Sequence, residues 1–108
     1  MSEDSLEIDP AELKRLIDSG ASMQIVDVRA PWEHTIVALE GDVLIPMQAL
    51  GSRSEELDRS RKIVLYCHHG SRSWIAARAL RDAGFDAVSL RGGIDRWARS
   101  VDPSLAKY

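Results

Sequence analysis

The fold of this chain is decided by the stretch Lys62-Ile63-Val64-Leu65-Tyr66-Cys67-His68-His69-Gly70-Ser71-Arg72-Ser73. Its first five residues are nearly all apolar, which predicts a strand that is covered on both faces. A tight polar loop follows, and residues 73–83 then have the apolar spacing of a helix. A strand, a tight loop and a helix in this order are typical of a parallel α/β sheet.

The rest of the chain repeats this alternation of short apolar runs and helical stretches. We expect an α/β fold of three α/β/α layers, in which a central five-stranded parallel sheet lies between helices. Ligands of such sheets bind at the carboxyl ends of the strands, and Cys67 follows one of these ends. The predicted strands are residues 6–8, 24–28, 43–45, 62–66 and 87–90, and the predicted helices are residues 11–19, a short helix from 31, 54–58, 73–83 and 94–99.

Length and composition are those of one ordinary globular domain. The 108 residues are 44% hydrophobic and 29% charged, and we expect a flexible N-terminus over 1–5 and a single domain over 6–108. The net charge of −3 argues against nucleic-acid binding, which requires a basic face. No apolar run reaches the roughly 20 residues of a membrane span, and the acidic start is unlike a secretory signal. We therefore expect a cytoplasmic protein with no nucleic-acid or membrane partner.

Cys67 is the only cysteine of the chain, so it cannot form an intramolecular disulfide or a multi-cysteine zinc site. Its polar neighbours indicate a reactive thiol, because inert cysteines lie among apolar residues. The loop after it directs backbone N–H groups into one hollow, and Gly70 lets this loop fold back tightly. The helix N-terminus adds partial positive charge, which favours a thiolate. We therefore predict that Cys67 is a nucleophile.

Three segments of the sequence resemble those of the rhodanese family, and the match extends from about Leu6 onward. The loop 67–72 looks like the six-residue active-site loop of rhodanese domains. The other segments are Asp27-Val28-Arg29 with Trp32-Glu33, which is similar to the first signature of the family, and Gly92-Gly93-Ile94-Asp95-Arg96-Trp97, which is similar to its C-terminal signature. The ending Val101-Asp102-Pro103-Ser104 resembles rhodanese domains that occur alone or fused to ubiquitin-like activating enzymes.

The resemblance implies a thiosulfate sulfurtransferase. Cys67 would attack the outer sulfur of a donor such as thiosulfate, release sulfite and carry the sulfur as a persulfide to a thiol acceptor. Arg72 would bind the anionic end of the donor. The implied substrate-binding residues are His68, His69, Gly70, Ser71 and Arg72, and the implied structural residues near the site are Asp27, Arg29 and Glu33. We expect Arg29 to pair with Glu33, one helical turn later, and no metal or cofactor is implied.

The sequence departs from the family beside this predicted site. Many relatives carry a histidine-apolar-proline-glycine-small segment before the third strand, where this chain has Ala38-Leu39-Glu40-Gly41-Asp42. His34-Thr35 replaces a more usual aromatic pair. One histidine and one proline are therefore lost and two carboxylates are gained. These changes leave Cys67 untouched and bear on the choice of donor or partner.

Two other functions compete with this interpretation. A cysteine-based phosphatase or arsenate reductase also uses a thiolate in an N–H-lined loop, but the related phosphatases have one more residue between cysteine and arginine. A protein-to-protein sulfur-relay module would use a cysteine desulfurase persulfide as donor or a small sulfur-carrier protein as acceptor. His68 and His69 either contact substrate or only set the charge of the loop, and nothing in their spacing orients a ring as a base. A zinc site made of these histidines and Cys67 is disfavoured, because adjacent residues rarely point at one metal.

Overall fold

The computed structural model describes residues 5–108. Residues 1–4, which make up most of the predicted flexible N-terminus, lie outside the described part of the chain. The strands are β1 (Glu7–Ile8), β2 (Met23–Asp27), β3 (Val43–Leu44), β4 (Lys62–Tyr66) and β5 (Ala87–Leu90). The helices are α1 (Pro10–Asp18), α2 (Pro31–Ile36), α3 (Leu50–Arg53), α4 (Ser71–Asp82) and α5 (Gly93–Ser100), with 3₁₀ turns η1 (Met47–Ala49) and η2 (Ser54–Glu56) on either side of α3.

The five strands form one sheet in the order β1-β5-β4-β2-β3, and every neighbouring pair is parallel. The predicted five-stranded parallel sheet is therefore confirmed. The strand β4 lies at its centre between β2 and β5, and Asp27 pairs in register with Tyr66. The carboxyl ends of β2 and β4 consequently lie side by side, and the residues that follow them start from the same edge of the sheet.

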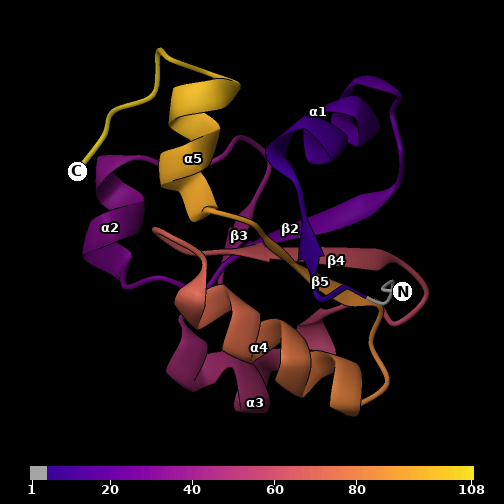
Figure 1. The fold of residues 1–108 in the computed structure, drawn as a ribbon. Helices are drawn as coiled ribbons and strands as arrows, with labels where there is room; N and C mark the ends of the chain where they lie inside the picture. Colours follow the sequence, from indigo (N-terminus) through magenta and orange to yellow (C-terminus); the bar gives the residue numbers. More distant parts are fainter. Residues whose placement is uncertain (1–4) are drawn as a thin grey trace.

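Helices cover both faces of the sheet, as expected for a three-layer fold. In Figure 1, α1, α2 and α5 lie on one side, and α3 and α4 lie on the other. Alternate residues of β4 point to the two faces: Ile63 and Leu65 pack in the cluster under α3 and α4, whereas Val64 and Tyr66 pack in the opposite cluster. The strand is therefore buried on both faces, as its continuous apolar run predicts.

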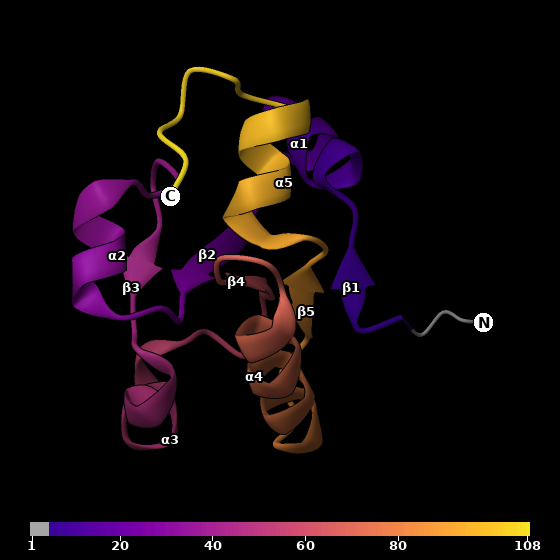
Figure 2. The ribbon, with the colours of Figure 1, turned by 60° about the vertical axis from the view of Figure 1, so that its left-hand side comes forward.

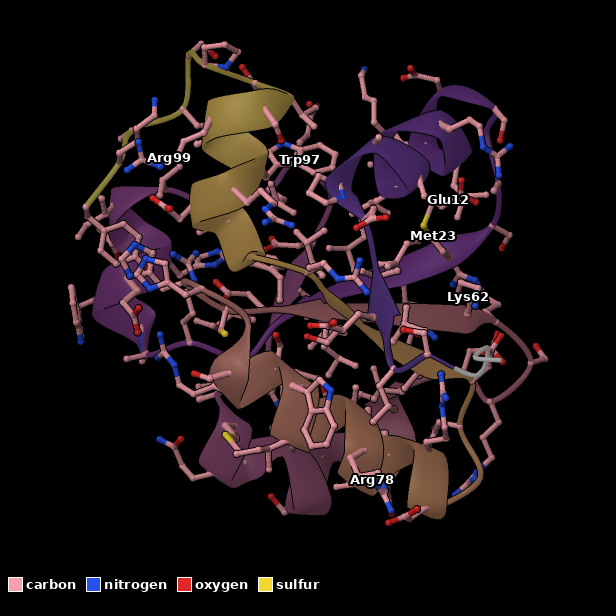
Figure 3. All side chains as sticks on the ribbon, viewed as in Figure 1. Glu12, Met23, Lys62, Arg78, Trp97 and Arg99 are labelled. Carbon is pink, nitrogen blue, oxygen red and sulfur yellow. The ribbon has the colours of Figure 1, made fainter. Side chains whose placement is uncertain are left out.

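The helices are short and owe their stability to one packed face. The longest described helix, α4, has 12 residues, and α5 has 8. Figure 3 shows Trp97 pointing from α5 toward α1, and this residue shares an apolar cluster with Leu13 of α1. Within residues 5–108, no helix combines the length and the apolar character needed to cross a membrane.

Two helix predictions needed correction. The helical piece expected over 54–58 is instead the short turn Ser54–Glu56, which follows the unpredicted helix α3. Elements this short have too few residues to show a hydrophobic period. The helix α4 begins at Ser71, two residues earlier than predicted, because Gly70 takes a left-handed conformation with φ of 109° and turns the chain directly into the helix. The other boundaries shift by a residue or so, as helix and strand ends usually do.

Leu65 is fully buried in the cluster beneath α3 and α4. Replacing it with alanine leaves a cavity in the central strand, so we expect Leu65→Ala to lower the free energy of unfolding by about 2–5 kcal/mol. Urea denaturation measures this loss. The control is Ile75→Ala, because Ile75 is 55% exposed and we expect a change of no more than about 0.5 kcal/mol. Equal losses in the two variants would contradict the packing described here.

Candidate active site

Cys67 lies directly after β4 and is 1% exposed. Its Sγ accepts hydrogen bonds from the backbone N–H of Gly70 at 3.1 Å and of Ser73 at 3.4 Å. The second of these N–H groups belongs to the first turn of α4, whose orphan donors point out of the helix end. Negative charge on the sulfur is stabilised by such donors. Two backbone N–H groups therefore point at the Cys67 sulfur, one from the predicted loop and one from the residue after it.

A pair of buried serines lies beside the sulfur, and the sequence interpretation missed it. The Ser73 hydroxyl is 3.5 Å from the Cys67 sulfur and 2.6 Å from the Ser89 hydroxyl. Ser73 comes from α4 and Ser89 from β5, and both are fully buried. Ser73 directly follows the predicted loop, so its position was a usable signal. The sequence carried no signal for Ser89, because this residue reaches the site only through the pairing of β5 with β4.

The N-terminus of α5 supports the back of the loop. The Ile94 N–H donates to the carbonyl of Cys67 at 2.9 Å, and the Asp95 N–H donates to the carbonyl of His68 at 3.0 Å. A Cβ on Gly93 would lie 2.3 Å from the His68 carbonyl oxygen, and the φ of this glycine is +65°. Only glycine fits so close to another backbone in this conformation. A glycine at position 93, the first residue of α5, is thus needed for this close contact with the loop.

Arg72 extends from the first turn of α4 and forms a two-pronged ion pair with Glu33 of α2. Its Nη1 donates to Oε1 at 2.7 Å and its Nη2 to Oε2 at 3.0 Å. The predicted pair between Arg29 and Glu33 is wrong. Arg29 precedes Ala30, the N-cap of α2, so the helical spacing rule does not apply to it. The sequence interpretation missed the pairing of Glu33 with Arg72, because the two residues are 39 positions apart.

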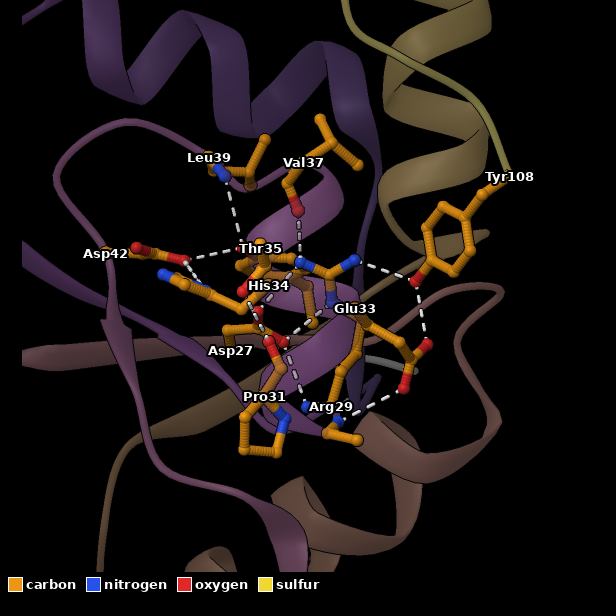
Figure 4. Close-up of polar contacts among 12 residues, drawn as sticks. Asp27, Arg29, Pro31, Glu33, His34, Thr35, Val37, Leu39, Asp42 and Tyr108 are labelled. Carbon is orange, nitrogen blue, oxygen red and sulfur yellow. Dashed lines mark hydrogen bonds and ion pairs between the residues drawn. The ribbon is translucent and has the colours of Figure 1, made fainter.

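Arg29 is buried completely and pairs with Asp27. Its Nε and Nη2 donate to the two carboxylate oxygens of Asp27, each at 2.8 Å, and Nη2 also donates to the Val37 carbonyl at 2.6 Å. Figure 4 shows this guanidinium at the centre of the polar contacts between β2, α2 and the chain end. A buried charge is tolerated only when it is paired and hydrogen-bonded. The predicted structural role of these two residues agrees with this geometry and remains a prediction.

Tyr108 joins this network from the other end of the chain. Its hydroxyl accepts from Arg29 Nη1 at 2.7 Å and donates to Glu33 Oε2 at 2.7 Å, and its ring stacks on His68 with centroids 3.9 Å apart. Figure 2 shows the segment after α5 crossing back toward α2. Burial raises the pKa of the Tyr108 hydroxyl to about 12, so it stays protonated as a donor. The sequence carried no signal for this contact.

The two loop histidines differ in their surroundings. His68 is stacked between Tyr108 and His69, and its buried Nε2 has no hydrogen-bond partner among the described residues. Burial, assisted by the neighbouring His69, lowers the pKa of His68, which keeps the ring neutral near pH 7. His69 is exposed, with its Nε2 3.9 Å from Asp95 Oδ2. Ser71 is exposed at the start of α4, beside the loop.

His34 and Asp42 belong to the two segments that were expected to depart from the family, and they come together in the structure. His34 Nδ1 lies 2.9 Å from Asp27 Oδ2 and 3.8 Å from Asp42 Oδ2. The Tyr66 hydroxyl donates to the same Asp42 oxygen at 2.5 Å. Burial raises the pKa of Asp42, and burial with the Asp42 bond also raises the pKa of Tyr66. His34 and Asp42 therefore extend the hydrogen-bond network of Asp27 and Arg29 toward β3.

Two sets of side chains place three potential metal ligands within 4.8 Å of one another. They are His68, His69 and Asp95, and Asp27, His34 and Asp42. In the first set Asp95 Oδ2 already accepts a hydrogen bond from Arg99 Nε at 3.0 Å. In the second set both Asp27 oxygens already accept from Arg29. We therefore assign a metal to neither set.

A family model described as the rhodanese-like domain matches residues 9–100. The chain thus belongs to the rhodanese-like domain family. It is 42% identical over 104 residues to the probable adenylyltransferase/sulfurtransferase MoeZ of Mycobacterium tuberculosis, a match that covers 94% of this chain and 26% of that protein. The chain therefore spans about a quarter of the length of this relative.

Two further comparisons involve proteins of nearly the same length. A sulfurtransferase of Allochromatium vinosum is 34% identical over 101 residues, which cover 93% of this chain and 94% of that protein. A crystal structure of a rhodanese-related protein from Thermoplasma volcanium superposes with a TM-score of 0.81 at 29% identity, covering 88% of this chain and 92% of that one. The fold and the family are thus those of rhodanese-like proteins, and both sequence relatives carry the name sulfurtransferase.

The Glu33 carboxylate generates a prediction about acid stability. The bonds from Arg72, with smaller contributions from Tyr108 and Ala30, lower the pKa of Glu33 from 4.5 to about 2. A carboxyl with a depressed pKa in the folded state contributes stability above its unfolded pKa and loses it as the pH falls toward the folded one. We expect the stability gap between wild type and Glu33→Gln, measured by urea denaturation, to narrow as the pH falls from about 4.5 toward about 2. A gap that does not change with pH would contradict this assignment.

The hydroxyl of Tyr108 bridges two charged side chains, and its removal leaves both with one partner fewer. We expect Tyr108→Phe to lower the free energy of unfolding by about 1–3 kcal/mol, the usual range for hydrogen bonds to charged groups. Thermal and urea denaturation both report this loss. Tyr108→Leu also removes the stacking on His68 and should cost more. Wild-type stability in both variants would show that the chain end does not hold the network.

Proposed function

We propose that this protein is a sulfurtransferase in which Cys67 carries a sulfur atom as a persulfide. The observation that carries the proposal is the pair of backbone N–H groups at Sγ: those of Gly70 and Ser73 donate to the sulfur at 3.1 and 3.4 Å. These donors stabilise a thiolate before the reaction and the negative persulfide after it. The names of the two sulfurtransferase relatives support the same chemistry.

The reaction balances in two steps. The Cys67 thiolate attacks the outer sulfur of a donor, for example thiosulfate; a new S–S bond forms, the donor S–S bond breaks, and sulfite leaves with the bonding electron pair. An acceptor thiolate then attacks the terminal sulfur of the Cys67 persulfide and restores the Cys67 thiolate. Cys67 is 1% exposed, so a donor has to displace neighbouring side chains to reach the sulfur.

The loop residues hold the substrate in this proposal. The backbone around Gly70 cradles the terminal sulfur, as an oxyanion hole holds a developing charge. His68, His69 and Ser71 border the entrance, and Arg72 directs its remaining N–H groups to the donor. The short loop suits one sulfur atom better than a phosphate group, so we do not favour phosphatase or arsenate reductase chemistry.

Proteins are the proposed natural partners at one or both ends of the transfer. A cysteine desulfurase persulfide as donor and a small sulfur-carrier protein as acceptor fit a domain whose relative combines adenylyltransferase and sulfurtransferase in its name. Thiosulfate then serves as a convenient donor in the assay. We place the reaction in the cytoplasm, because a single catalytic cysteine has to stay reduced.

Intact-mass spectrometry tests the persulfide directly. We expect thiosulfate or a persulfide donor to add about 32 mass units to the wild-type protein, and dithiothreitol or cyanide to remove them. Cys67→Ser is the control and should gain nothing. If no donor adds this mass to the wild type, the sulfurtransferase proposal is wrong.

A further inference from the structure

The positive charge beside Cys67 is already engaged by a carboxylate. The side chain of Arg72 is 39% exposed, and Arg72 directly precedes Ser73, whose N–H donates to the Cys67 sulfur. Two of the Arg72 N–H groups donate to Glu33 at 2.7 and 3.0 Å. A guanidinium has five N–H groups, so three remain able to donate. The pair can therefore still form hydrogen bonds but presents no net charge to an incoming donor.

The carboxylate of Glu33 is held firmly in this position. Oε1 accepts from Arg72 and from the Ala30 N–H at 3.1 Å, and Oε2 accepts from Arg72 and from the Tyr108 hydroxyl at 2.7 Å. Four donors on one buried carboxylate keep it ionised at neutral pH. An anionic donor thus has to compete with a fixed negative charge for the same arginine.

The surroundings add apolar surface and further paired charges. Trp32, the neighbour of Glu33 on α2, is 63% exposed. Arg29 is paired with Asp27, and Arg99 with Asp95. Arg96 is exposed, and its side chain lies against Gly92. This residue is the same in the wild type and in every variant of the test.

From this geometry we infer that Glu33 is a specificity-determining residue: by neutralising Arg72 it favours monoanionic sulfur donors over the thiosulfate dianion. The inference rests on the proposed function, since it concerns the donor that loads Cys67. The favoured class is R–S–S⁻ or R–SO₂–S⁻, in which the group attached to the transferred sulfur is uncharged. The Cys67 thiolate attacks that sulfur, its bond to R–S or R–SO₂ breaks, and a thiolate or sulfinate leaves with the electron pair.

A matched pair of donors tests the inference. Methanethiosulfonate and thiosulfate differ by a methyl group in place of one charged oxygen. We expect the ratio of kcat/KM for thiosulfate to kcat/KM for methanethiosulfonate to rise at least about fivefold in Glu33→Gln, because the freed Arg72 charge then favours the dianion. An unchanged ratio in the folded variant would overturn the inference. A lower ratio would also overturn it and would show that Glu33 positions Arg72 for the dianion.

Two further variants show whether Glu33 acts on the donor ratio through Arg72. In the double variant Glu33→Gln/Arg72→Gln the ratio should return close to the wild-type value, because the added attraction comes from Arg72. A ratio that stays high in the double variant would overturn the role of the pair. Glu56→Gln is the matched charge control, since Glu56 forms an exposed pair with Arg53 in η2 and α3. If the donor ratio rose as much in Glu56→Gln as in Glu33→Gln, the effect would come from the net charge of the protein and not from the Glu33–Arg72 pair.

The wild-type protein provides a second measurement that does not depend on the folding of a variant. If Glu33 neutralises Arg72, raising the salt concentration should change the thiosulfate-to-methanethiosulfonate ratio of kcat/KM by less than about twofold. If Arg72 instead acted as an uncompensated cation facing the thiosulfate dianion, the same ratio would fall steeply as salt is added. A steep fall would overturn the inference.

The intact-mass result separates the two proposals: if neither donor loads Cys67, the proposed function fails, and the inference fails with it. If both donors load it and the ratio does not move, only the inference fails.

Discussion

The buried ion pair between Arg29 and Asp27 is the interaction on which the arrangement of the site depends. Arg29 is inaccessible to solvent, and its charge is satisfied by Asp27, the Val37 carbonyl and the Tyr108 hydroxyl. Breaking a buried pair by removing one partner typically costs about 3–5 kcal/mol, because a charge is left without compensation. Three separate parts of the chain, β2, the end of α2 and the segment after α5, are thereby tied to one guanidinium. The position of Glu33, and through it that of Arg72, follows from this arrangement.

The sulfur site itself is built on a different principle, the convergence of backbone groups. The Cys67 sulfur receives N–H groups from Gly70 and Ser73, while the carbonyl of Cys67 receives the Ile94 N–H. The N-terminus of α4 therefore faces the sulfur, and the N-terminus of α5 supports the loop from behind. Backbone donors held in this way would need no reorganisation during the proposed sulfur transfer. Glycines occupy the close approaches, because a Cβ on Gly93 would collide with the loop.

These two assemblies meet at Arg72, which belongs to the loop by sequence and to the buried network by contact. Family resemblance would assign this arginine to the donor, whereas the structure shows its guanidinium bound to Glu33. The same network extends through Asp27 to His34 and Asp42, which belong to the segments that were expected to depart from the family. In the proposed reaction, residues that do not touch the sulfur thus set the charge that is available beside it.

The sequence by itself determined the architecture and singled out Cys67 as the candidate nucleophile of the proposed reaction. The continuous apolar run before Cys67 predicted a central strand, and the polar loop with Gly70 predicted a hollow lined by N–H groups; both are local consequences of residue type and spacing. Only the tertiary structure decided the partners of the charges. Arg29 was expected to pair with Glu33, and no sequence period brings Glu33 to Arg72 or Tyr108 to His68, since these pairs form across the sheet edge between distant segments. Local propensity acts over a few residues, whereas the partner of a buried charge is set by which chain segments the sheet order places together.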